Sequence, residues 1–170
     1  MNDNEKIQII SAIVEHKPGV LHSISNMFRR RGFNIESISV GVAEQKDLAR
    51  MTITIKGDDR TVEQVVKQLK KLIDVVKVSI LDPSESVTRE LALIKVSTSD
   101  ARVRSDIINY TEIFKGHVVD VAHESLIIEI TGDLDKINAF IELMRPFGVK
   151  EIARTGITAL TRGMRSVKME

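Results

Sequence analysis

The sequence predicts an α+β protein made of two tandem βαββαβ units, each with an antiparallel sheet. The first observation is that apolar residues follow strand and helix periods in alternation over residues 7–81. The second is that the same order of periods can be read again over residues 91–152. A polar, proline-bearing segment separates the two halves. We therefore expect two small ferredoxin-like domains, residues 1–82 and 89–170, joined by a linker of residues 83–88.

The composition fits a soluble globular chain and argues against several other classes. With 170 residues, of which 42% are hydrophobic, the chain is long and apolar enough to bury a core. It has no cysteine for a disulfide framework or a thiolate metal site, and 25 basic against 24 acidic residues give no electrostatic reason for nucleic-acid binding. Met1 leads into polar residues, and no apolar run approaches the roughly 20 residues that span a bilayer. We expect a cytoplasmic protein with neither a membrane nor a nucleic-acid partner.

Residues 7–42 predict a strand, a helix and a second strand. The run from Ile7 to Val14 is apolar on both faces, which is typical of a central, covered strand. Pro18 and Gly19 break this pattern, and the following residues are apolar at helical spacing up to Gly32, a residue type that commonly ends helices. The buried stripe of this helix is expected to consist of Val20, Ile24, Met27 and Phe28, with Leu21 widening it. Residues 33–42 then alternate as a strand.

Residues 43–81 complete the first unit with a strand, a helix and a strand. Met51, Ile53 and Ile55 alternate with threonines, so this segment is expected to pair with the preceding strand as a hairpin. Gly57-Asp-Asp59 opens a helix whose apolar positions continue to Ile73. Residues 75–81 form the closing strand.

The second half repeats this order. The expected elements are, in order, a strand at 91–96, a helix at 102–114, strands at 118–122 and 126–130, a helix at 137–144 and a strand at 149–152. Gly132-Asp133 precedes the second of these helices as Gly57-Asp58 precedes its counterpart in the first half. The correspondence indicates that the two domains share one topology.

The first unit also contains two turns that lie far apart within one domain. The first two strands of a βαββαβ unit run parallel, so the loop Lys17-Pro-Gly19 and Asn34 are expected at opposite ends of the sheet, roughly 15 to 20 Å apart. They cannot share a ligand within one chain. A twofold axis that pairs the second strands of two chains would bring Asn34 of one chain toward the Gly19 loop of the other. We expect a homodimer formed through the first domain, with a site at its interface.

The residue types at these turns suit a free amino acid. Backbone N–H groups of the turn and of the following helix N-terminus can receive a carboxylate. The side chain of Asn34, which both donates and accepts, can contact an ammonium and a carboxylate. Val20 and Ile35 offer apolar surface for an aliphatic side chain. The alternative is that Pro-Gly and an Asn after a helix end are ordinary turn chemistry.

Seven segments resemble a known family of regulatory subunits. His16–Leu21 with Arg31–Ile35 resembles the ACT-domain signature of amino-acid-sensing modules. The other segments are similar to the small regulatory subunit of acetohydroxyacid (acetolactate) synthase, and they are Arg50–Ile53, Arg89–Val96, Thr111–Gly116 and Glu151–Ile157 with Thr161–Gly163. The match runs in the same order from about Ile9 to Gly163. The resemblance implies an ACT amino-acid-binding domain at residues 1–82.

The family implies a non-catalytic subunit in branched-chain amino-acid (valine, leucine and isoleucine) biosynthesis. It would bind and activate the large catalytic subunit and confer feedback inhibition by valine or another branched-chain amino acid. No cofactor is expected in this chain, whereas thiamine diphosphate and Mg²⁺ are expected in the catalytic partner, with FAD as a further candidate. Carried over by position, Gly19 and Val20, within the signature that includes Pro18 and Leu21, offer backbone groups to the carboxylate. Asn34 and Ile35 come from the facing subunit.

One residue departs from the family pattern. Many members have Asn three residues before the turn glycine, where this chain has His16. An imidazole there can still hydrogen-bond a carboxylate, but it is larger and titrates near neutral pH. This leaves open the affinity for valine, its specificity and its pH dependence.

The sequence also bears on other functions. The four histidines show no HxxxH or HxH spacing, which argues against a metal site. Arg29-Arg-Arg31 can contact a phosphate or an acidic partner, although the helix dipole already favours basic residues at that helix end. A stand-alone ACT-type sensor with another partner, and a small enzyme on the ferredoxin-like fold, remain as alternatives. We expect no catalytic residues in this chain.

Overall fold

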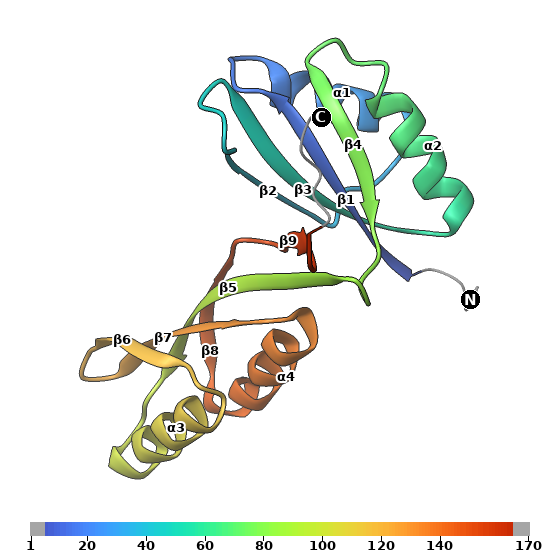
Figure 1. Ribbon diagram of the computed structural model, residues 1–170. Helices are drawn as coiled ribbons and strands as arrows, with labels where there is room; N and C mark the ends of the chain where they lie inside the picture. Colours follow the sequence, from blue (N-terminus) through green and yellow to red (C-terminus); the bar gives the residue numbers. More distant parts are fainter. Residues whose placement is uncertain (1–5, 165–170) are drawn as a thin grey trace. The chain divides into compact units, whose positions relative to one another are not determined.

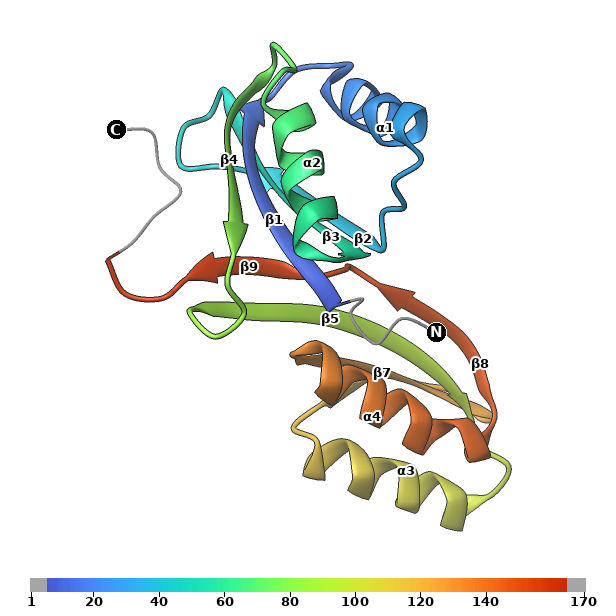
Figure 2. The same ribbon diagram turned by 90° about the vertical axis from the view of Figure 1, so that its right-hand side faces the viewer.

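The computed structural model describes residues 6–164, which form two compact units (Figure 1). Of the described residues, 6–87 and 157–164 belong to the first unit, and 88–156 belong to the second. Each unit contains one antiparallel sheet with two helices on one of its faces (Figure 2). The predicted fold class, two ferredoxin-like βαββαβ units, is confirmed.

The first unit has the predicted order of elements. They are β1 (Lys6–Glu15), α1 (Val20–Arg31), β2 (Ser37–Val42), β3 (Leu48–Gly57), α2 (Asp59–Leu69) and β4 (Val75–Leu81). The strands lie in the order β2-β3-β1-β4, and neighbouring strands are antiparallel. β1 and β3 are therefore central, which explains why most of their residues are buried on both faces, whereas β2 is an edge strand.

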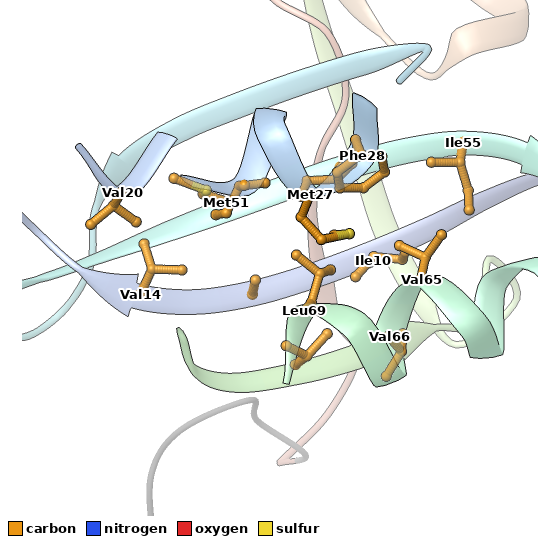
Figure 3. Close-up of a cluster of buried hydrophobic side chains, with 14 of the residues drawn as sticks. Ile10, Val14, Val20, Met27, Phe28, Met51, Ile55, Val65, Val66 and Leu69 are labelled. Atoms are coloured by element: carbon orange, nitrogen blue, oxygen red, sulfur yellow. The ribbon is translucent and has the colours of Figure 1, made fainter. Parts of the chain in front are cut away.

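The helices cover one face of this sheet and enclose its main core (Figure 3). Figure 3 shows Phe28 and Met27 of α1 pointing toward Leu69 and Val65 of α2 above Ile10 of β1, and all five side chains are buried. α1 ends where the sequence predicts, because Gly32 adopts the left-handed conformation with φ 68°. α2 begins after Asp58, whose side chain accepts a hydrogen bond of 2.8 Å from the N–H of Thr61.

A segment from the end of the chain packs with the other face of the first unit. The hydroxyl of Ser39 donates to the carbonyl of Ile157 at 3.0 Å, and the N–H of Ile157 donates to the hydroxyl of Ser37 at 3.4 Å. Ile157 and Ala159 are buried, the latter in the short strand β9 (Thr158–Thr161). The division at residues 88 and 157 therefore differs from the predicted second domain of residues 89–170. The physical reason is that the hydroxyls of β2 bind the backbone of a segment that lies beyond the second βαββαβ pattern.

The second unit repeats the topology of the first. Its elements are β5 (Ser86–Ser97), α3 (Ala101–Ile113), β6 (His117–Val121), β7 (Ser125–Gly132), α4 (Leu134–Met144), a 3-10 turn (Arg145–Phe147) and β8 (Val149–Arg154). The strands lie in the order β6-β7-β5-β8. Apolar residues of β5 and β7 pack under the two helices around Phe140 and Ile107. Among the described residues of both units, no helix is long and apolar enough to cross a bilayer.

A buried ion pair joins the strands β5 and β8 of the second unit. Glu90 is only 4% exposed, and its carboxylate accepts hydrogen bonds from Nε and Nη2 of Arg154 at 2.7 and 2.6 Å. Nη1 of Arg154 donates to Asn138 of α4 at 3.0 Å. The hydrogen bonds to Glu90 raise the pKa of the Arg154 guanidinium. The pair therefore holds two strands and a helix together through one side chain.

We expect Glu90→Gln to lower the free energy of unfolding by about 1–3 kcal/mol, because it leaves a partly buried guanidinium without its counter-charge. Urea denaturation of the full chain measures this change. A matched control is Glu151→Gln, which breaks the ion pair of Lys95 and Glu151 between the same two strands. Since Glu151 is exposed, its loss should lower the free energy of unfolding much less than the loss of Glu90 does. Equal effects of the two substitutions would contradict a special role for burial.

Candidate functional site

The turn after β1 exposes backbone donors at the start of α1. Gly19 has φ 92° and ψ −18°, a backbone conformation that residues with a side chain rarely adopt. The space beside its Cα is open. The first hydrogen bond of the helix runs from the N–H of Ser23 to the carbonyl of Gly19 at 2.9 Å. The N–H groups before Ser23, those of Val20 and Leu21 among them, have no carbonyl within the helix to bind. The turn therefore presents donors to an anion from outside the helix.

Two neighbouring loops hold this turn in place. The ammonium of Lys17 contacts Asp74 at 2.7 Å and Glu15 at 2.5 Å. The N–H of Glu15 donates to the carbonyl of Asp74 at 2.9 Å, and the N–H of His16 donates to the carbonyl of Asp47 at 2.7 Å. Asp74 lies in the loop from α2 to β4, and Asp47 lies in the loop from β2 to β3. These contacts could not be predicted from the sequence, because Asp74 and Asp47 lie far along the chain from the turn.

The anchor at Lys17 predicts a pH effect that can be measured directly. Its hydrogen bonds, first to Asp74 and then to Glu15, raise the pKa of the Lys17 ammonium above its ordinary value. The contact therefore stabilises the folded chain fully below the ordinary lysine pKa, and the stabilisation is lost as the pH rises through the higher folded-state value. We expect Asp74→Asn to lower the pKa of Lys17, as followed by NMR titration of its side chain. An unchanged pKa in Asp74→Asn would refute the anchor.

Asn34 lies at the other end of the sheet from Gly19. In the register, Val14 and Val42 both pair with Ala49, whereas Ile9 and Ser37 both pair with Thr54. Five residues of β1 separate the two levels, which is about 16 Å. Gly19 follows β1 at the end of the sheet marked by Ala49, and Asn34 precedes β2 at the end marked by Thr54. The predicted separation of the two turns within one chain is therefore confirmed.

The predicted site residues differ in what they expose. His16, Pro18 and Gly19 are exposed on the turn. Val20 is 3% exposed and belongs to the core, as its place in the buried stripe predicts, so its side chain cannot also supply apolar surface to a ligand. Leu21, which is predicted to widen that stripe, is instead 48% exposed and provides the apolar surface beside the turn. Asn34 is exposed, and its amide donates to Glu36 at 3.1 Å. Ile35 is half-buried against the core.

The edge strand β2 is open to pairing along its outer side. Ala43 donates its N–H to the carbonyl of Leu48 at 2.9 Å, and in an antiparallel pair the bonded positions alternate. The N–H groups of Val40 and Val42 therefore point away from β3. Their side chains are 49% and 61% exposed. β2 thus offers both unpaired backbone groups and apolar surface to a second strand.

The described residues show no grouping that suits a metal ion. Within residues 6–164, no three His, Asp or Glu side chains come close enough to hold one. His22 instead hydrogen-bonds Asn26 of the same helix at 2.7 Å.

Comparison with known proteins agrees with this arrangement over nearly the whole chain. The family described as "AHAS small subunit-like ACT domain" matches residues 10–77, and the family described as "Small subunit of acetolactate synthase" matches residues 89–163. These two matches fall on the two βαββαβ patterns.

Individual relatives are similar at high identity. A probable acetolactate synthase small subunit of Methanothermobacter thermautotrophicus is 57% identical over 159 residues, which cover 94% of this chain and 95% of that protein. The acetolactate synthase small subunit of Aquifex aeolicus is 52% identical over 162 residues, 95% of this chain and 84% of that one. The crystal structure of the small subunit from Thermotoga maritima has a TM-score of 0.86 at 48% identity, covering 93% of this chain and 98% of that one. The chain therefore belongs to the family of acetolactate synthase small subunits.

Proposed function

We propose that this chain is the non-catalytic regulatory subunit of an acetolactate synthase, which activates the large catalytic subunit and makes it sensitive to valine. The observation that carries the proposal is the open Gly19 turn within a chain that belongs to this family. The large subunit would supply thiamine diphosphate, Mg²⁺ and, as a further candidate, FAD. The assembly would act in the cytoplasm, in the synthesis of valine, leucine and isoleucine.

The amino acid binds between two first units. Its carboxylate contacts the free N–H groups that follow Gly19, where the partial positive charge of the α1 N-terminus favours an anion. Asn34 and Ile35 of the facing subunit complete the site, the first by hydrogen bonds and the second by apolar contact. Leu21 of the first subunit, which is exposed beside the turn, contributes apolar surface for the aliphatic side chain.

The homodimer forms by antiparallel pairing of β2 with its counterpart in the second copy. Three observations support this geometry: β2 is an edge strand, its outer N–H groups are unpaired within the sheet, and Val40 and Val42 are exposed. The separation of about 16 Å between the two turns requires a second chain, because one chain cannot close the site. The twofold axis gives two equivalent sites per dimer.

Regulation then follows from a shift between two arrangements of the dimer. Valine that contacts both subunits favours the arrangement in which its two half-sites meet, and the large subunit responds to that arrangement. Valine bound equally well by both arrangements would change nothing.

The test is to measure acetolactate formation by the large subunit of the same organism, with and without this chain, over a valine titration. Activation together with inhibition by valine is the expected result. Activation without inhibition would support the large subunit as the partner of this chain and refute valine as its ligand. Amino-acid binding without any effect on acetolactate formation would indicate a stand-alone sensor with another partner.

Asn34→Ala should raise the valine concentration for half-inhibition by about tenfold or more, since a hydrogen bond to a charged ligand group contributes about 1.5–3 kcal/mol. Activation of the large subunit should not change, because Asn34 is exposed and lies between two elements. Asn109→Ala, an exposed asparagine on α3, is the matched control and should behave like the natural chain. An unchanged response of Asn34→Ala to valine would remove this residue from the site.

A further inference from the structure

A basic groove lies between α1 and α2 on the outer side of the first unit. It has a volume of about 340 Å³, within the roughly 300–1,000 Å³ range of small-molecule sites. Three cationic side chains line it, Arg30 and Arg31 from the end of α1 and Lys71 from just after α2, and no acidic side chain is among the residues that line it. Positive charge from two separate elements therefore converges on one hollow.

The three cations have no counter-charge within the described part of the chain. Ion pairs of the first unit involve other cations, among them Lys17, Arg50 and Lys67. In residues 6–164, the side chains of Arg30, Arg31 and Lys71 make neither an ion pair nor a hydrogen bond. Their donors are thus available to a ligand.

The remaining lining of the groove also suits an anion. Ser23 and Gln68 add a hydroxyl and an amide group beside the cations, whereas the amide of Asn26 already binds His22. Guanidinium groups bind phosphate oxygens in pairs, and hydroxyl and amide donors supply further hydrogen bonds. Met27 gives the groove an apolar wall, which lowers the local dielectric and strengthens these contacts.

The helix dipole alone does not explain this arrangement. It favours Arg29, Arg30 and Arg31 equally, since all three lie in the last turn of α1. Yet only Arg30 and Arg31 line the groove, together with a cation from the other helix. Adjacent cations without counter-charges repel one another, a cost that a multivalent anion relieves.

We propose that this groove binds a small anion with two or three linked phosphates, at a site separate from the amino-acid site. None of the residues that line the groove is among those proposed to contact the amino acid. A single phosphate would engage one or two of the cations, whereas a diphosphate or triphosphate has enough oxygens for all three.

Isothermal titration calorimetry of the full chain with sodium triphosphate tests the proposal. Inorganic phosphate, which has a single phosphate group, is the comparison ligand. Triphosphate should bind at least about tenfold more tightly than phosphate, and its affinity should fall as NaCl is raised. Arg30→Gln and Lys71→Gln should each weaken triphosphate binding about tenfold. Arg29→Gln and Lys70→Gln are matched controls, since each changes a neighbouring basic residue outside the groove, and they should stay within about twofold of the natural chain.

Equal losses in the groove variants and the matched controls would overturn the proposal, because they would show attraction to overall charge only. Absence of triphosphate binding, together with a loss of large-subunit activation in Arg30→Gln and Lys71→Gln, would show that the groove is a protein contact instead. Triphosphate binding should persist in Gly19→Asp. This variant therefore separates a failure of the groove from a failure of the amino-acid site.

Discussion

The expected result of Gly19→Asp is complete loss of valine inhibition with activation of the large subunit retained. The new carboxylate would occupy the open space beside the Cα of Gly19, next to the free N–H groups of α1. It would satisfy these donors and repel the carboxylate of the ligand. Acetolactate formation over a valine titration measures the change.

The substitution also strains the backbone, so a control must separate strain from charge. Gly19 has a positive φ of 92°, and a residue with a Cβ there costs about 1–2 kcal/mol. Gly19→Asn has the same shape and similar strain without the charge. We expect it to weaken valine inhibition only in part, and both variants to remain folded because domains are typically stable by about 5–15 kcal/mol.

Thermal unfolding of both variants checks that the chain is intact. Normal valine inhibition in Gly19→Asp would refute the proposed position of the ligand carboxylate. Equal, complete loss of inhibition in both variants would attribute the effect to the turn conformation and not to charge.

Val40→Pro should convert the homodimer to monomers and abolish valine inhibition with it. The N–H of Val40 points away from β3, so proline there leaves the β2–β3 ladder intact, as on other edge strands. It removes one hydrogen bond from each of two symmetric positions at the proposed interface. At about 1.5 kcal/mol each, this raises the dimer dissociation constant roughly 100-fold.

Val40→Thr is the matched control because it keeps the N–H and the β-branched shape. Sedimentation over a concentration series measures the oligomeric state, and we expect Val40→Thr to dimerise nearly as well as the natural chain. A stable, valine-sensitive dimer of Val40→Pro would show that β2 does not form the interface.

The order of strands and helices could be predicted because it depends on local patterns. The apolar run of Ile7–Val14 indicated a central strand, and β1 does lie between β3 and β4. Gly32 marked the end of α1 because few other residues adopt the left-handed conformation at a helix end. The parallel direction of β1 and β2 follows from this topology alone, and it placed Gly19 and Asn34 at opposite ends of the sheet.

The end of the chain could not be predicted in the same way. Residues 157–161 follow the last predicted strand and have too few apolar positions to show which surface they cover. Their position depends on the hydroxyls of Ser37 and Ser39, more than a hundred residues away in the sequence. Separation along the chain also hid the contact of Lys17 with Asp74, which fixes the turn of the proposed site.

The sequence by itself determined the two βαββαβ units, the family, and the turn at Gly19, since each depends on residues close together in the chain. Only the tertiary structure decided that the side chain of Leu21 is exposed beside the turn, that Lys17 is anchored by Asp74, and that Arg30, Arg31 and Lys71 share one groove. The physical reason is that a period of apolar residues specifies which face of an element is buried. It does not specify which distant side chain meets that element once the helices have packed on the sheet.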